Sequence, residues 1–138
     1  MPNVLKISEA ASLALHTTVL LAVDIAKSHT TREIAQLLGV SEAHLSKVMQ
    51  RLVKEGIVHS IRGPKGGFTL AADPKKTSLL EVFEVIEGPL THTDCLLSRR
   101  VCDGTNCILG SLLQNTNKAV HDYLENTRIA DLTSVYTE

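Results

Sequence analysis

The sequence has very few aromatic residues and no long hydrophobic run. It contains no tryptophan, two tyrosines and two phenylalanines among 138 residues, so a domain of this size must build its core mainly from aliphatic side chains. The most apolar run, residues 19–23, is followed by Asp24 and is far too short to span a bilayer. The N-terminal residues lack a basic region leading into an apolar stretch, so we expect a cytoplasmic protein with no membrane partner.

Cysteine is scarce as well, and catalytic motifs are missing. Only three cysteines occur, an odd number that argues against a secreted disulfide scaffold. There is no phosphate-binding loop, no paired-carboxylate motif and no nucleophile elbow. We therefore expect that the protein is not an enzyme.

The net charge of −1 conceals an uneven distribution. Between residues 41 and 76 there are seven basic and three acidic residues, a formal charge of +4, which leaves −5 for the rest of the chain. A basic window of this kind is typical of a surface that faces phosphates, although an ordinary solvated face gives the same pattern.

The apolar periodicity and the capping signals predict a mainly α fold with five helices and one small β-hairpin. Thr30 with Glu33, and Ser78 with Glu81, have the spacing of capping boxes at helix starts. We assign residues 1–75 to a winged helix-turn-helix DNA-binding region and residues 76–138 to a cysteine loop and a long dimerisation helix. The predicted helices span residues 9–27, 30–38, 41–55, 78–87 and 107–127, and the predicted strands span residues 58–62 and 68–71.

Residues 30–55 have the pattern of a helix-turn-helix. Gly39 permits a tight turn, and the next helix has an apolar stripe at i, i+3, i+4 and i+7 from Leu45. The outer face of such a helix can enter a major groove, where Ser and Lys side chains read base edges. An ordinary helical hairpin with a solvated face is the alternative. The candidate DNA contacts on this helix are Ser41, His44, Ser46, Lys47 and Arg51.

A glycine-rich hairpin follows directly, with the sequence RGPKGG at residues 62–67. Glycines let the tip turn and let the backbone approach a phosphate or a narrow groove, and Arg62 and Lys65 supply positive charge there. A plain turn with two surface cations is the alternative. Its place directly after a helix-turn-helix favours a wing that contacts DNA.

A polar loop holds all the cysteines of the chain, which are Cys95, Cys102 and Cys107 in the pattern C-x6-C-x4-C. Thiolates on flexible loops are the usual ligands of iron–sulfur clusters, and the neighbouring Arg99 and Arg100 favour the thiolate form. Three other interpretations stay open. They are a structural zinc site completed by His92, thiol redox sensing without a metal, and three unconnected surface cysteines.

The last predicted helix carries apolar residues at steps of three and four between Ile108 and Thr127. A helix this long beside so small a domain has little core of its own to cover, so we expect it to pack against the first helix and a second subunit. Packing within one chain alone is the alternative. A homodimer also suits double-stranded DNA, because two recognition helices can read a palindrome one turn apart.

Several segments together resemble the bacterial IscR/NsrR-type regulators. They are EIA at 33–35, GVS at 39–41, LVKEGIV at 52–58, SIRGPKGGFTL at 60–70, EGP at 87–89, the cysteine loop and TRIADL at 127–132. The resemblance covers nearly the whole chain. It implies a homodimeric winged-helix transcription factor whose long C-terminal helix crosses that of its partner, with an iron–sulfur cluster held by the cysteines. By the same alignment, members of this family contact DNA at the positions of Ser41, Ser46, Lys47 and Arg62.

The cysteine spacing departs modestly from the family pattern, so the resemblance leaves both a [4Fe-4S] and a [2Fe-2S] cluster open. In relatives the ligand beyond the three cysteines is a side chain that follows them or one on the first helix of the other subunit. No histidine closely follows Cys107 here. The matching positions on the first helix are Ser12 and His16, of which His16 is the better iron ligand.

The predicted function is a sequence-specific DNA-binding transcriptional regulator, such as a repressor, that senses redox state, nitric oxide or iron through the cluster. One alternative is a winged-helix regulator that responds through thiols or a partner protein and holds no cluster. The alternative from another class is an iron–sulfur redox or electron-transfer protein. The wing argues against that class, because an electron carrier does not need one.

Overall fold

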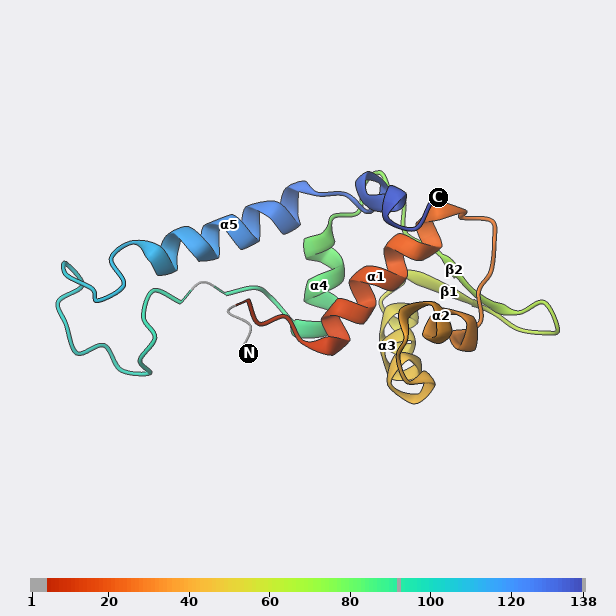
Figure 1. Cartoon of the computed structure of the whole chain (residues 1–138), viewed down its shortest axis with the longest axis horizontal. Helices are drawn as coiled ribbons and strands as arrows, with labels where there is room; N and C mark the ends of the chain where they lie inside the picture. Colours follow the sequence, from red (N-terminus) through yellow and green to blue (C-terminus); the bar gives the residue numbers. More distant parts are fainter. Residues whose placement is uncertain (1–4, 92, 138) are drawn as a thin grey trace.

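The computed structural model describes residues 5–91 and 93–137, which form a mainly helical fold with one two-stranded antiparallel hairpin (Figure 1). The predicted fold class is therefore confirmed. Among the described residues, no helix is long and apolar enough to cross a membrane. The elements in chain order are α1 (Glu9–Val23), α2 (Thr31–Leu38), α3 (Glu42–Lys54), β1 (Val58–Ile61), β2 (Gly67–Leu70), α4 (Leu79–Glu87), α5 (Leu112–Asn126) and the 3₁₀ helix η1 (Ile129–Val135).

Side-chain caps fix where the helices begin. The Thr30 hydroxyl accepts a hydrogen bond from the Glu33 amide (3.1 Å), and the Glu33 carboxylate accepts one from the Thr30 amide (3.2 Å). Ser78 and Glu81 make the same pair of bonds at the start of α4. Each capping box satisfies amides that a helix start would otherwise leave unpaired, so both predicted starts are confirmed.

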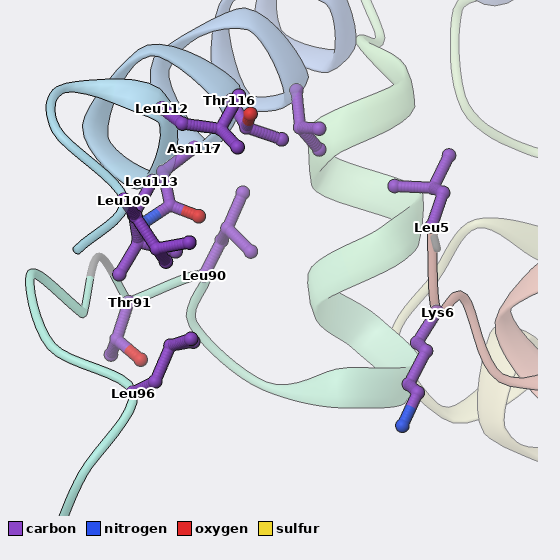
Figure 2. Close-up of a pocket in the computed structure, with 11 residues that line it drawn as sticks. Leu5, Lys6, Leu90, Thr91, Leu96, Leu109, Leu112, Leu113, Thr116 and Asn117 are labelled. Atoms are coloured by element: carbon purple, nitrogen blue, oxygen red, sulfur yellow. The ribbon is translucent and has the colours of Figure 1, made fainter. Parts of the chain in front are cut away.

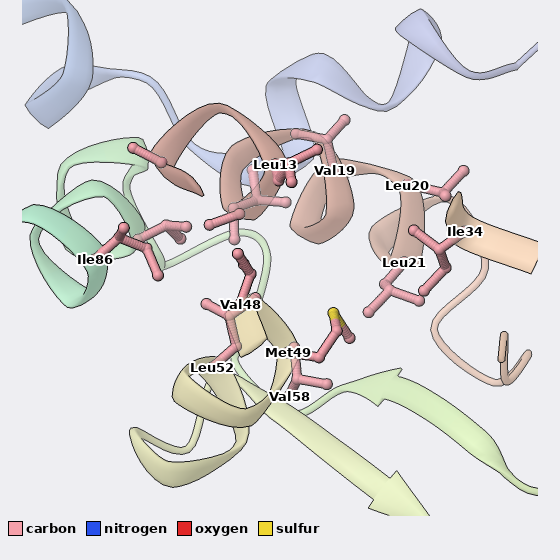
Figure 3. Close-up of a cluster of buried hydrophobic side chains, with 14 of the residues drawn as sticks. Leu13, Val19, Leu20, Leu21, Ile34, Val48, Met49, Leu52, Val58 and Ile86 are labelled. Atoms are coloured by element: carbon pink, nitrogen blue, oxygen red, sulfur yellow. The ribbon is translucent and has the colours of Figure 1, made fainter. Parts of the chain in front are cut away.

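α1 lies at the centre of the fold, with α3, α4 and η1 packed against it (Figures 1 and 3). On the facing side of α3, Leu45, Met49 and Leu52 are fully buried. Among the buried hydrophobic residues that the structure describes, Phe83 is the single aromatic. The core is therefore aliphatic, as the composition predicts. The buried residues of α1 are Ala11, Leu13, Ala14, Thr17, Thr18, Val19, Leu20 and Leu21.

The hairpin of β1 and β2, here called the wing, is joined through the first half of β2 to the connection between α1 and α2. The His29 amide donates to the Phe68 carbonyl (3.0 Å), and the Phe68 amide donates to the His29 carbonyl (2.8 Å). Gly67 is needed at this junction, because a Cβ there would lie 2.6 Å from the His29 carbonyl oxygen and its φ is +147°. β2 is thus held against the α1–α2 connection at its end next to the turn, and the turn itself extends outward (Figure 1).

Two predicted helix limits are wrong. α1 ends at Val23 rather than at residue 27, because the Asp24 carboxylate accepts a hydrogen bond from the Ala26 amide (3.1 Å) and so stabilises a turn in place of helix. α5 begins at Leu112 rather than near residue 107, since the residues just before it form turns. The sequence pattern also fails to predict η1, whose apolar positions are too few to set a period.

α5 projects from the body and carries the cysteine loop (residues 93–111) at its far end (Figure 1). We call residues 93–126 the arm and the other described residues, 5–91 and 127–137, the body. Leu124 is the one buried residue of α5, whereas the side chains of Ile108 and Leu112 are 99% and 61% exposed. The arm therefore has little core of its own.

Candidate DNA-binding surface and cysteine site

The outer face of α3 carries most of the predicted DNA contacts. Ser41 and Lys47 are exposed there, and His44 and Ser46 are half-buried. The Ser41 hydroxyl caps α3 by accepting a hydrogen bond from the His44 amide (3.2 Å), which fixes the conformation of the first turn. The structure thus groups four of the five predicted side chains at the N-terminal end of α3.

Arg51, the fifth predicted contact on α3, has a partner within the protein. Its Nη2 donates to the carbonyl oxygen of Val85 (2.9 Å), near the C-terminal end of α4. The last four carbonyls of a helix have no partner inside the helix, and a cation is favoured beside them. The guanidinium therefore joins α3 to α4, a role that the sequence pattern does not predict.

The wing tip presents the predicted cations to solvent. Arg62 and Lys65 are both exposed. The tip is a tight turn in which the Gly66 amide donates to the Gly63 carbonyl (2.9 Å), and Gly63 has a φ of +106°. A Cβ on Gly66 would lie 2.4 Å from a backbone oxygen, so the turn depends on glycine at that position.

The three cysteines line one cavity of about 170 Å³. The remaining walls are mainly apolar, from Leu96, Leu97, Val101, Ile108, Leu109 and Leu113, with Asn106 as the further polar member. No disulfide joins the cysteines, and the Sγ of Cys107 accepts a hydrogen bond from the Leu109 amide (3.5 Å). Three thiols around one apolar space are a donor set that suits an iron–sulfur cluster. Cys95 is half-buried, whereas Cys102 and Cys107 are exposed.

Internal contacts brace the cysteine loop. The Arg100 guanidinium bonds to the Asp94 carboxylate (2.9 Å) and also packs on Gly104, where a Cβ would lie 3.2 Å from its Nη1. Hydrogen bonds from the hydroxyl and amide of Thr105 lower the pKa of Asp103 below its usual value. The Arg100 contacts with Asp94 and Gly104 span Cys95 and Cys102, respectively.

The two candidate ligands on α1 lie away from this cavity within one chain. Neither Ser12 nor His16 lines it, and neither does any His, Asp or Glu of the described residues. Instead, His16 Nδ1 lies 2.5 Å from the hydroxyl of Tyr136, with the two rings nearly perpendicular. Burial raises the pKa of Tyr136, so this hydroxyl keeps its proton. His92, the fourth ligand of the zinc alternative, lies outside the described residues.

α5 carries a second group of possible metal ligands. The ligand atoms of His121, Asp122 and Glu125 lie within 4.8 Å of one another. Lys118 already bonds to Asp122 (2.5 Å), which lowers the pKa of the carboxyl and raises that of the ammonium. We therefore assign this group to surface ion pairing.

A groove of about 380 Å³ runs along the start of α5 (Figure 2). Apolar side chains of α5, among them Leu112, Leu113 and Val120, form one wall, and Leu5 and Leu90 lie opposite. Leu96, Leu109 and Leu113 line both this groove and the cysteine cavity. The apolar surface of the arm is therefore continuous with the cysteine site.

Contacts between elements far apart in the sequence escape prediction. The Ser8 hydroxyl, which caps α1, donates to the carboxylate of Glu87 at the end of α4. Glu9 Oε1 lies 3.6 Å from Nδ1 of His44 on α3. The partners are 79 and 35 positions apart, so no local spacing could reveal them.

Comparisons with known proteins agree with this architecture. Among relatives, the chain is 29% identical over 131 residues to an HTH-type transcriptional regulator of Aquifex aeolicus, over 93% of this chain and 91% of that protein. It is 29% identical over 102 residues to the transcriptional regulator IscR of Vibrio vulnificus, over 74% of this chain and 61% of IscR. Among solved structures, CymR of B. subtilis, a global cysteine regulator, superposes with a TM-score of 0.78 at 28% identity, over 97% of this chain and 99% of that chain.

These relatives are transcriptional regulators rather than enzymes, which confirms the expectation from the missing catalytic motifs. Residues 7–134 match the Rrf2 family, whose description reads iron-dependent transcriptional regulator. The predicted likeness to IscR-type regulators is confirmed by the same comparisons. Because the family match spans nearly the whole chain, this protein belongs to the Rrf2 family of transcriptional regulators.

Proposed function

We propose that this regulator is a homodimer whose affinity for its operator depends on an iron–sulfur cluster held by Cys95, Cys102 and Cys107. The observation that carries the proposal is the single apolar cavity that these three side chains line. Residues 1–75 would contact DNA and residues 76–138 would receive the signal, which is redox state, nitric oxide or iron supply. α4 and η1 nevertheless pack on α1, so both parts share one core.

DNA recognition is assigned to α3 and the wing. Lys47 on α3 and Arg62 and Lys65 on the wing are exposed cations within the basic window of the sequence. Cations of this kind bind phosphates, and Arg also reads guanine or a narrow minor groove. Ser41, His44 and Ser46 lie at the end of α3 that makes base contacts in helix-turn-helix proteins.

The cluster needs a ligand beyond the three cysteines, and we propose that the partner subunit supplies it. His16 is the candidate, with Ser12 as the weaker one. The hydrogen bond between His16 Nδ1 and Tyr136 leaves Nε2 as the ligating nitrogen, and a metal-bound histidine generally has such a support on its other nitrogen. A bound [4Fe-4S] or [2Fe-2S] cluster would supply sensitivity to oxidants or nitric oxide.

The dimer is assigned to the arm. Leu112 and Tyr123 of α5 are exposed, and an apolar groove adjoins the helix. A second copy would bury both, as symmetric oligomers bury self-complementary surfaces. The cysteine loop connects α4 to α5, so a change in the order of that loop can alter the separation of the two recognition helices.

A second candidate is a regulator that responds through thiols or a partner protein without a cluster. This second candidate is favoured by the likeness to CymR, a cysteine regulator whose structure matches 97% of this chain. The three free cysteines serve this function as well.

Operator affinity measured side by side for cluster-loaded and cluster-free protein, at fixed salt, tests the proposal. Serine at Cys95, Cys102 or Cys107 is expected to abolish visible absorbance and to alter operator affinity together. Anaerobic purification followed by Mössbauer spectroscopy identifies the cluster type. A protein that stays colourless under anaerobic conditions yet loses DNA on thiol oxidation would support the second candidate, and equal affinities in all states would sink both.

A further inference from the structure

The contact between Glu9 and His44 joins α1 to the recognition helix at the surface assigned to DNA. Glu9 Oε1 lies 3.6 Å from His44 Nδ1, and the side chains are 68% and 37% exposed. This separation is within ion-pair distance when the imidazole is protonated. His44 occupies the first turn of α3, next to the capping residue Ser41.

The backbone that carries Glu9 is held in place by the cap of α1, by the core and by α4. Glu9 is the first residue of α1 and follows Ser8, whose side chain caps the Ala11 amide (3.0 Å) and also bonds to Glu87 of α4. Ala11, one turn further along α1, is fully buried. The helix start that carries Glu9 is therefore anchored in the core and to α4, so the carboxylate approaches His44 from a fixed backbone.

A carboxylate near Nδ1 favours one of the two neutral forms of the His44 imidazole. In a neutral imidazole one nitrogen donates and the other accepts, and a carboxylate next to one nitrogen favours the proton there. Nε2 is then the nitrogen that keeps a free lone pair. It can accept from the amino group of adenine or cytosine, or donate to guanine when the ring is protonated.

We propose that Glu9, a residue outside the helix-turn-helix, is a positioning residue for operator recognition that orients His44 so that Nε2 contacts a base edge. The inference rests on the proposed function, because it requires α3 to enter the major groove. A free carboxylate at this surface repels phosphates. The pair therefore contributes to sequence preference and not to affinity for DNA of random sequence.

A double-mutant cycle on an operator selected from a random duplex library by the full-length protein tests the proposal. His44→Ala is expected to weaken operator binding about tenfold, and Glu9→Gln about threefold. Adding Glu9→Gln to His44→Ala is expected to cause no further loss, since the carboxylate acts only through the imidazole. Binding to random DNA is expected to stay equal or to strengthen in Glu9→Gln.

Glu42→Gln is the matched control, because it removes a carboxylate from the first turn of α3 without touching His44. It is expected to leave base preference unchanged, whereas Glu9→Gln and His44→Ala relax preference at the same operator position. Glu9→Asp is expected to restore part of the preference. Nitrogen-detected NMR of the imidazole is expected to show the Nδ1 proton of His44 in the wild type and its loss in Glu9→Gln.

Losses of operator affinity that add up in the double mutant, or a base preference of Glu9→Gln that matches that of Glu42→Gln, would overturn the role of Glu9. Neither result would contradict DNA binding itself. A wild-type protein that selects no sequence from the library would instead overturn the proposed function, and this inference with it. The two failures are thus distinguishable in one data set.

Discussion

The body and the arm of this chain are stabilised in different ways. The body buries aliphatic side chains of α1, α3 and α4 in one continuous core, whereas α5 buries only Leu124 among its own residues. The arm exposes apolar side chains and carries three free thiols in a loop of turns. Helices in proteins take most of their stability from tertiary packing rather than from intrinsic helix propensity. With so little packing, α5 of a single chain is therefore weakly stabilised.

The difference teaches where a signal can act. A region with its own core has one stable arrangement, while a region without one takes its order from a partner or a ligand. This contrast supports the proposal that the signal acts on the arm. The body is suited to hold α3 and the wing in one geometry.

The largest effect is expected where the arm meets its partner. Replacing Leu112 and Leu113 with glutamate would place unpaired charge in the proposed interface, at a cost of several kcal/mol. We expect monomers or insoluble protein, measured by sedimentation velocity. Glutamate at Ile25, an exposed residue outside the arm, is the control. A wild-type protein that sediments as a monomer at micromolar concentration would count against the dimer.

The next effect sharpens the contrast between the two regions. Leu45 is fully buried and Ile108 is 99% exposed. Leu45→Ala is expected to lower the free energy of unfolding by about 2–5 kcal/mol, and Ile108→Ala to change it by less than about 0.5 kcal/mol. Urea denaturation at one protein concentration measures both. Similar losses for the two variants would mean that Ile108 is buried in solution, either in the core or against a second copy.

The body could be predicted from the sequence because its signals are local. The Thr30–Glu33 and Ser78–Glu81 boxes and the stripe from Leu45 each lie within one helix, and the structure contains all of them. Pairing of the strands likewise follows from the glycine-rich turn at residues 62–67. Local rules suffice where neighbours in sequence determine the geometry.

Contacts across the fold have no comparable local signal in the sequence. Asp24 ends α1 through a turn, and η1 folds back so that Tyr136 reaches His16, although both segments look unremarkable as sequence. Arg51 lies in the exposed pattern of α3 but bonds to α4. Such partners depend on how the helices pack, which periodicity does not encode.

A smaller effect concerns the wing. Arg62→Ala is expected to weaken operator binding by about 1–3 kcal/mol if Arg62 reads a base edge or a narrow groove. Lys75 is the matched cation on the loop beside η1, where the Ala130 amide bonds to the Pro74 carbonyl. Lys75→Ala is expected to act equally on all sequences and to reduce the salt slope by at most about one. Fluorescence anisotropy over a salt series measures both, and wild-type affinity in Arg62→Ala would refute the wing assignment.

The smallest expected effect is the loss of stability in a variant of Arg51, and it tests whether Arg51 supports the fold or contacts DNA. Its bond to the Val85 carbonyl supports the end of α4, so Arg51→Gln is expected to lower the free energy of unfolding by about 1 kcal/mol. Lys54→Gln is the charge-matched control in the last turn of α3, with an expected change within about 0.5 kcal/mol. If the guanidinium serves α4, the two variants weaken operator binding equally, because each removes one charge. A greater loss of operator affinity in Arg51→Gln, with unchanged stability, would mean that Arg51 contacts DNA rather than supporting α4.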